Sequence, residues 1–155
     1  DTTTVVARLQ TIAGRGLGDP LRPRALQRLG LVMFDAGSYD AALDQFKGGN
    51  YAAAVAGFQG FVKAYPKSPL APSAQYWVGN AQFAQKDYRG AIASQRQLIA
   101  GYPDSQKVPD ALLNIGSSQF ELGDAAGARR TLQELVAKHP TSDAAAKARQ
   151  RLAAR

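Results

Sequence analysis

A short motif recurs along this chain at a constant spacing of 37 residues. Tyr-Pro at positions 65–66 is followed by Tyr-Pro at 102–103 and by His-Pro at 139–140. A repeat of this length is typical of proteins built by stacking similar structural units, so it constrains the fold more than any single motif. Further positions recur with the same period: Ala54, Ala91 and Ala128; Gly79 and Gly116; Phe46, Phe83 and Phe120.

Each repeat unit is predicted to contain two helices. In the middle unit, Tyr76, Gly79 and Phe83 follow one another at steps of three and four residues, which places them on one helix face. Asp87 is suited to cap the next helix, and that helix must end before Pro103. The repeats are therefore expected at about 38–70, 71–107 and 108–140, with a capping helix at 142–154.

The recurring small residues are expected where paired helices approach most closely. The alternative is that Gly79 and Gly116 are tolerated helix defects, each costing about 1 kcal/mol. Their recurrence at the repeat period favours close packing.

The middle unit carries the pattern of a known repeat family. The segment "AQYWVGNAQFAQKDYRGAIASQRQLIAGYP" (74–103) has an aromatic residue, a hydrophobic-Gly pair, a second aromatic residue, Asp-Tyr, Ala and a final Pro. It resembles a tetratricopeptide repeat (TPR). This resemblance implies an all-α fold, a right-handed superhelical stack of helix hairpins. With its longer connecting loops, the segment 38–155 resembles the C-terminal TPR domain of the Tol–Pal-associated periplasmic YbgF/CpoB family.

That resemblance implies a function. It indicates a non-catalytic, periplasmic adaptor that binds an envelope protein such as TolA and links outer-membrane constriction by the Tol–Pal system to septal peptidoglycan synthesis. The family's trimer depends on an upstream coiled coil, which residues 1–37 do not show. The repeats alone are thus expected to be monomeric or weakly self-associating.

The N-terminal segment 1–37 fits the family poorly. A short helix is expected to present Val5, Leu9 and Ile12 on one face. The segment 25–43 mimics the first helix and turn of a repeat, with Ser38-Tyr39 at the turn, yet the 37-residue register assigns 38–48 to a first helix. Two interpretations of this segment stay open: a degenerate capping repeat and a non-native fusion. If it is a fusion, the alternative function is an engineered or structural scaffold without a native ligand. Residues 1–20 lack the features of a signal peptide, so an exported protein would be represented by its mature form or a fragment.

Composition argues against several other functions. The net charge is +7, from 19 basic and 12 acidic residues, but the basic residues are scattered, which favours a solvated surface over nucleic-acid binding. With no cysteine and one histidine, the chain offers neither a zinc site nor a thiol nucleophile. No apolar run is long enough to span a membrane. We expect no enzymatic activity, no cofactor and no metal.

A partner-binding groove is expected on the first helices, which line the concave side of such a stack. Apart from Lys47, no groove cation is evident, so a clamp for a terminal carboxylate is not favoured. Aromatic and amide side chains suit a helix or an extended peptide instead. Core packing is the alternative role for the aromatic residues, above all Phe83 and Phe120. The candidate groove residues are Tyr39, Leu43, Phe46, Tyr76, Trp77, Asn80, Phe83, Leu113, Asn114, Ser117 and Phe120.

Overall fold

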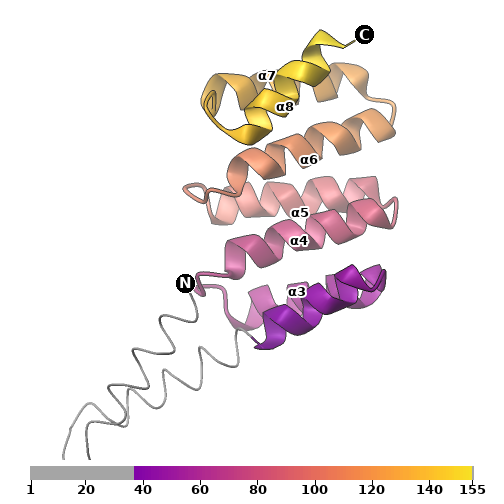
Figure 1. Ribbon diagram of the computed structural model, residues 1–155, viewed down its shortest axis with the longest axis vertical. Coiled ribbons are helices and arrows are strands. Elements are labelled where there is room, and N and C mark those ends of the chain that lie inside the picture. The colour runs from indigo at the N-terminus through magenta and orange to yellow at the C-terminus, as the bar shows by residue number, and fades with distance from the viewer. Residues whose placement is uncertain (1–36, 155) are drawn as a thin grey trace, which may run out of the picture.

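The computed structural model describes residues 37–154 (Figure 1). A helical stretch over 37–47 precedes six complete helices, and the described residues contain no strand. This confirms the prediction of an all-α helical repeat stack. The expectations for Val5, Leu9 and Ile12 fall outside the described residues. The complete helices are α3 (Tyr51–Ala64), α4 (Ala71–Ala84), α5 (Tyr88–Gly101), α6 (Val108–Glu121), α7 (Ala125–Lys138) and α8 (Asp143–Ala153).

The helices form two layers. Figure 1 shows one layer nearer to the viewer, made of the helix over 37–47, α4, α6 and α8. The second layer lies behind it and consists of α3, α5 and α7. Within the described residues α4 contacts α6 and α6 contacts α8, whereas no comparable contact joins α3 to α5 or α5 to α7. The near layer is therefore the more tightly spaced, concave side of the stack. We call its solvent-facing side the inner surface, and the layer of α3, α5 and α7 the outer layer.

Residues 38–39 lie within a helix and not at a turn. The stretch 37–47 is helical, and its Ala42 is buried at 3% exposure. The similarity of Ser38-Tyr39 to Asp87-Tyr88 was therefore misleading. The 37-residue register, which assigned this stretch to a first helix, is the correct guide.

The loops explain the motif that recurs at the repeat period. The Tyr102 hydroxyl donates a 2.7 Å hydrogen bond to the carbonyl oxygen of Pro66 in the preceding loop, which ties successive loops together. A serine follows at the same place in each loop. Ser68 and Ser105 accept hydrogen bonds from backbone N–H groups two residues later, and Ser142 caps α8 by accepting from the N–H of Ala145 at 3.0 Å.

Aspartates cap two of the outer helices. Asp87 accepts from the N–H of Gly90 at 3.0 Å, as its position before α5 predicted, and Asp124 accepts from the N–H of Gly127 at 2.9 Å. Glycine at the donating position leaves room for the carboxylate, because a Cβ atom on Gly90 would lie 2.2 Å from Asp87 Oδ2.

The recurring small residues lie at close helix contacts, as predicted. Ala54, Ala91 and Ala128 are each 0% exposed. A Cβ atom on Gly79 would lie 2.1 Å from the Gln95 amide nitrogen, and one on Gly116 would lie 2.9 Å from a Leu132 methyl group. A larger residue at either glycine would push the paired helices apart.

A left-handed backbone conformation recurs in the turn between the two helices of each unit. Gly49 and Gly123 have φ angles of 82° and 84°, and the equivalent Lys86 has a φ angle of 65°. A side chain in this region costs about 1 kcal/mol or more. Sequence reasoning missed this position because a lysine occupies it in the middle unit.

Replacing Lys86 by glycine should therefore stabilise the protein. We expect Lys86→Gly to raise the free energy of unfolding by roughly 0.5–1 kcal/mol, because the gain from relieved strain exceeds the extra backbone entropy of glycine in the unfolded chain. Gly123→Ala is the matched control and should lower it by a similar amount. Urea denaturation of both variants measures the effect, and a loss of stability in Lys86→Gly would contradict it.

The core consists of two apolar clusters. The first joins the helix over 37–47, α3 and α4, and the second joins α5 to α8. Their fully or nearly buried members are Ala42, Ala54, Phe58, Phe61, Ala74, Val78 and Ala81 in the first, and Leu98, Val108, Ala111, Leu112, Leu132, Leu135, Ala144, Ala145 and Ala148 in the second.

Polar side chains join α4 to α5 at the boundary between these clusters. Gln75 donates to the carbonyl oxygen of Ser94 at 2.8 Å, the Ser94 hydroxyl donates to Gln82, and Gln95 donates to the carbonyl oxygen of Tyr76 at 3.1 Å. Gln75, Ser94 and Gln95 are buried. We call Gln75, Gln82, Ser94 and Gln95 the glutamine layer. These hydrogen bonds contribute, together with buried apolar residues such as Val78 and Ala91, to the register of α4 against α5.

Candidate functional site: the inner surface

The eleven candidate groove residues all lie in the near layer. They belong to the helix over 37–47, α4 and α6, and each of them retains some solvent exposure. Phe120 is the most exposed, at 42%, and Phe83 is half-buried. None of them is completely buried. Six of them also pack against the apolar clusters, so core packing is part of their role: Tyr39, Leu43, Phe46, Tyr76, Trp77 and Leu113.

The N-terminal part of the inner surface is an interlocked group of aromatic rings. Trp77 lies edge-on to Phe46, with ring centroids 4.9 Å apart, and stacks on Phe58 at 6.4 Å. Tyr39 packs edge-on against Phe58 at 5.5 Å. Since Phe58 is fully buried, Tyr39, Phe46 and Trp77 support the first apolar cluster while exposing one side to solvent. A substitution at any of them will change stability as well as surface.

The centre of the inner surface carries amide groups from two successive units. The Asn114 amide nitrogen donates a 2.9 Å hydrogen bond to the Asn80 side-chain oxygen, which joins α6 to α4. The two asparagines occupy different positions of their repeats, so mapping each repeat separately did not predict this contact. Their remaining hydrogen-bonding groups lie on half-buried side chains that a partner can reach.

Tyr76 lies beside this asparagine pair. Burial raises the pKa of its hydroxyl above the ordinary tyrosine value of 10.0, the hydrogen bond with Asn80 lowers it, and the carboxylate of Asp110 raises it. The Lys107 ammonium lies 5.3 Å from the centre of the Tyr76 ring. Tyr76 is therefore a neutral group at physiological pH, held between an amide and a cation.

A hollow of about 440 Å³ lies at the C-terminal end of the inner surface. It is lined by Phe83 of α4, by Ser117, Phe120 and Glu121 of α6, and by Arg151 and Ala154 at the end of the chain. We call it the C-terminal hollow. Arg151 donates a hydrogen bond to the Ser117 hydroxyl, which links α8 to α6 across the hollow.

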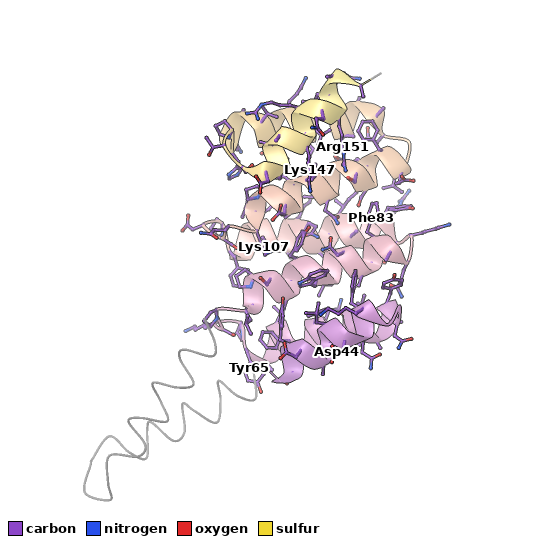
Figure 2. The ribbon with its side chains drawn as sticks, in the orientation of Figure 1. Asp44, Tyr65, Phe83, Lys107, Lys147 and Arg151 are labelled. Carbon is purple, nitrogen blue, oxygen red and sulfur yellow. The ribbon has the colours of Figure 1, made fainter. Side chains whose placement is uncertain are left out.

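Sequence reasoning assigned one cation, Lys47, to this surface and overlooked three others. Lys107, Lys147 and Arg151 appear in Figure 2 on the same side of the stack as Phe83. Lys147 and Arg151 were missed because α8 was interpreted only as a cap. The available signal was their spacing of four residues, which places both on one side of α8.

Two sequence profiles match this region of the chain. Both describe a tetratricopeptide repeat, one over residues 39–106 and the other over residues 110–142. This chain belongs to the tetratricopeptide-repeat family. Comparison with curated proteins gave no match. Tetratricopeptide repeats generally mediate contacts between proteins, and proteins built from them are typically non-catalytic adaptors.

Neither a metal-binding cluster nor a helix able to span a membrane is found in the described part of the TPR domain. Within residues 37–154, no group of three or more His, Cys, Asp or Glu side chains is arranged to hold a metal ion. None of the helices over that range combines the length and the hydropathy that crossing a membrane requires. The inner surface instead offers aromatic rings, amides and cations along one continuous helical layer.

Proposed function

We propose that this TPR domain is a non-catalytic adaptor whose inner surface binds a peptide or helix of a partner protein. The observation that carries the proposal is that aromatic and amide side chains of α4 and α6 remain partly exposed along the concave layer. Aromatic residues dominate the binding energy of protein interfaces, so partly exposed aromatic side chains on a concave surface support this function.

The proposed partner is an envelope protein such as TolA, and the proposed location is the periplasm. The support is the sequence resemblance of residues 38–155, connecting loops included, to the YbgF/CpoB family. In that role the domain links outer-membrane constriction by the Tol–Pal system to septal peptidoglycan synthesis. The alternative is a structural or engineered scaffold without a native ligand, which would show no binding to envelope proteins.

Tyr76 and Asn80 are the best positions at which to test the surface. They lie four residues apart on α4, so they face the same direction one turn apart. Tyr76 packs against the second apolar cluster, and Asn80 accepts a hydrogen bond from Asn114. Neither side chain is fully buried. Their removal should therefore change the binding surface more than it changes the core.

The double variant Tyr76→Ala, Asn80→Ala should weaken binding of purified TolA by about 2 kcal/mol, or roughly 30-fold. Calorimetric titration measures this effect, and thermal denaturation checks that the variant is folded. The control is Arg129→Ala with Arg130→Ala, two exposed positions on α7 of the outer layer, which should bind normally.

Two results would contradict parts of the proposal. Normal TolA binding by the folded Tyr76/Asn80 variant would exclude this part of the inner surface. Absence of TolA binding by the unsubstituted protein would exclude TolA as the partner and favour the scaffold alternative.

A further inference from the structure

A groove of about 490 Å³ lies between the helix over 37–47 and α3. These two helices form the end of the stack opposite to α8 (Figure 1). We call the hollow between them the N-terminal groove. Its lining within residues 37–154 is mostly alanine and glycine and includes no charged side chain. None of the residues that line it belongs to the eleven candidate residues of the inner surface.

The same positions are buried in the two later units. Ala41 corresponds to Val78 and Ile115 at the 37-residue spacing. Ala41 is exposed, whereas Val78 is 1% and Ile115 is 4% exposed. Gly57 is likewise exposed, whereas the corresponding Ser94 is buried. The N-terminal groove therefore repeats a contact surface that the later units bury and that the other described residues leave open.

An outer helix of the preceding unit covers these positions in the later units. α3 packs against α4, and α5 packs against α6. Phe58 of α3 lies in one apolar cluster with Val78, and Ile99 of α5 lines a narrow cleft together with Ile115 of α6. The N-terminal groove continues this series of contacts, so it suits an outer helix with one apolar face.

Small residues allow a helix to approach the N-terminal groove closely. Gly60 takes the place that Gln97 and Glu134 have in the later units, and a Cβ atom on Gly60 would meet nothing within 4 Å. A terminal unit that faces water needs a polar outer side, which the exposed basic side chains of α8 provide at the other end. The N-terminal groove has the opposite character, which indicates that a helix covers it.

The repeat register does not supply this helix. Counting back 37 residues from α3 (Tyr51–Ala64) gives residues 14–27. That segment contains three glycines, followed by Pro20 and Pro23. A proline inside a helix removes a backbone hydrogen bond and costs about 3 kcal/mol. Residues 14–27 are therefore unsuited to the outer helix that the groove needs.

Residues 1–13 have the chemistry that the groove requires. Val5, Leu9 and Ile12 follow one another at steps of four and three residues, which is the spacing of one helix face. The charged side chains of this segment are limited to Asp1 and Arg8. The segment can therefore offer an uncharged apolar face to an uncharged groove.

The connection between this segment and the described part of the chain is long enough for the contact. Residues 14–36 reach about 40 Å even when half extended, whereas α3 is about 21 Å long. The glycines and prolines near the start of this connection suit a reversal of the chain. Residues 1–13 can thus return along the groove beside the helix over 37–47.

We propose that residues 1–13 pack as a helix into the N-terminal groove and cover that end of the stack. Val5, Leu9 and Ile12 contact the alanines and glycines of the groove. The chain thereby caps its own stack with a helix that lies outside the repeat register. This inference concerns the end of the stack, so it does not depend on what the inner surface binds.

A spin label tests the contact in the 155-residue chain. Because the chain has no cysteine, Ala7→Cys provides a single attachment point for a nitroxide, on the side of the segment away from its apolar face. Nuclear magnetic resonance should show that the amide signals of Ala56, Gly57 and Gly60 lose most of their intensity. The amide signals of α8 should keep theirs.

Charges on the apolar face should release the labelled segment. Val5→Asp with Leu9→Asp places two carboxylates against an apolar groove and should restore the groove signals. Thr3→Asp with Gln10→Asp makes the same charge change on the opposite face and should leave these signals broadened.

A charge in the groove should have the same effect from the other side. Gly60→Glu places a carboxylate among the alanines and should restore the groove signals. Gly101→Glu is the matched control on α5, since Gly60 and Gly101 are both exposed and a Cβ atom at either would meet nothing within 4 Å. The control should leave the groove signals broadened.

Three results would overturn the inference. The first is undiminished groove signals in the labelled protein, and the second is broadening that persists in Val5→Asp with Leu9→Asp. The third comes from mixing nitroxide-labelled chains with isotope-labelled chains that carry no nitroxide. Broadening in this mixture would assign the groove to a second copy of the chain, whereas unchanged signals there are expected for a contact within one chain.

Discussion

Phe58→Ala should lower the free energy of unfolding by about 3–5 kcal/mol. Phe58 is 0% exposed and lies at the centre of the first apolar cluster. Its ring packs against Tyr39 and stacks on Trp77, so truncation leaves a cavity and removes two aromatic contacts. Denaturation in guanidinium chloride measures the loss.

Phe120→Ala is the control for this substitution. The same side chain is removed, but 42% of Phe120 is already exposed on the inner surface. We expect its stability to fall by only about 1 kcal/mol. Equal losses in the two variants would mean that burial is not what distinguishes the two phenylalanines.

Leu132→Ala should cost about 2–5 kcal/mol at the other end of the stack. Leu132 is 0% exposed in the second apolar cluster, and its methyl group lies against Gly116, where a Cβ atom would be only 2.9 Å away. Because glycine has no side chain that could fill the space, the cavity left by Leu132→Ala cannot be closed from α6. Chemical denaturation gives the size of the effect.

Hydrogen exchange should show that the losses of stability in Phe58→Ala and Leu132→Ala are local. Each unit of a repeat array contacts only its neighbours, so Phe58→Ala should reduce protection most in α3, and Leu132→Ala most in α6 to α8. Val136→Ala, at a half-buried position on α7, is a milder control for the second variant. An equal loss of protection throughout residues 37–154 would indicate that the stack unfolds as one cooperative unit.

The fold could be predicted from the repeat period because each repeat unit must meet the same constraints on helix packing and helix capping. Gly79 and Ala91 are conspicuous in the sequence since only small residues fit where helices touch, and Asp87 is conspicuous since a helix start needs an acceptor. The turn at Lys86 was not predictable in this way, because a lysine gives no sign of a positive φ angle. The match of Ser38-Tyr39 to Asp87-Tyr88 suggested a turn that the structure does not have. Two matching residues are weaker evidence than the pattern of a whole helix face.

The candidate site was predictable only within each repeat. The periodicity placed Tyr76, Asn80 and Asn114 on first helices, and the structure has them there. The periodicity did not predict the hydrogen bond between Asn114 and Asn80, because that contact depends on how far α6 is rotated against α4. Arg151 was missed for a related reason, since its proximity to Ser117 depends on how the last helix packs across the stack.

The glutamine layer gives the middle and the ends of the stack different responses to temperature. Burial of apolar surface stabilises less as a protein is cooled, whereas hydrogen bonds between buried amides do not depend on that entropic contribution. Cooling should therefore weaken the apolar contacts in the clusters around Phe58 and Leu132, to which α4 and α5 also contribute, more than it weakens the hydrogen bonds between α4 and α5. In the cold, these hydrogen bonds would hold a larger share of the contact between the two helices, one of which carries Tyr76 and Asn80.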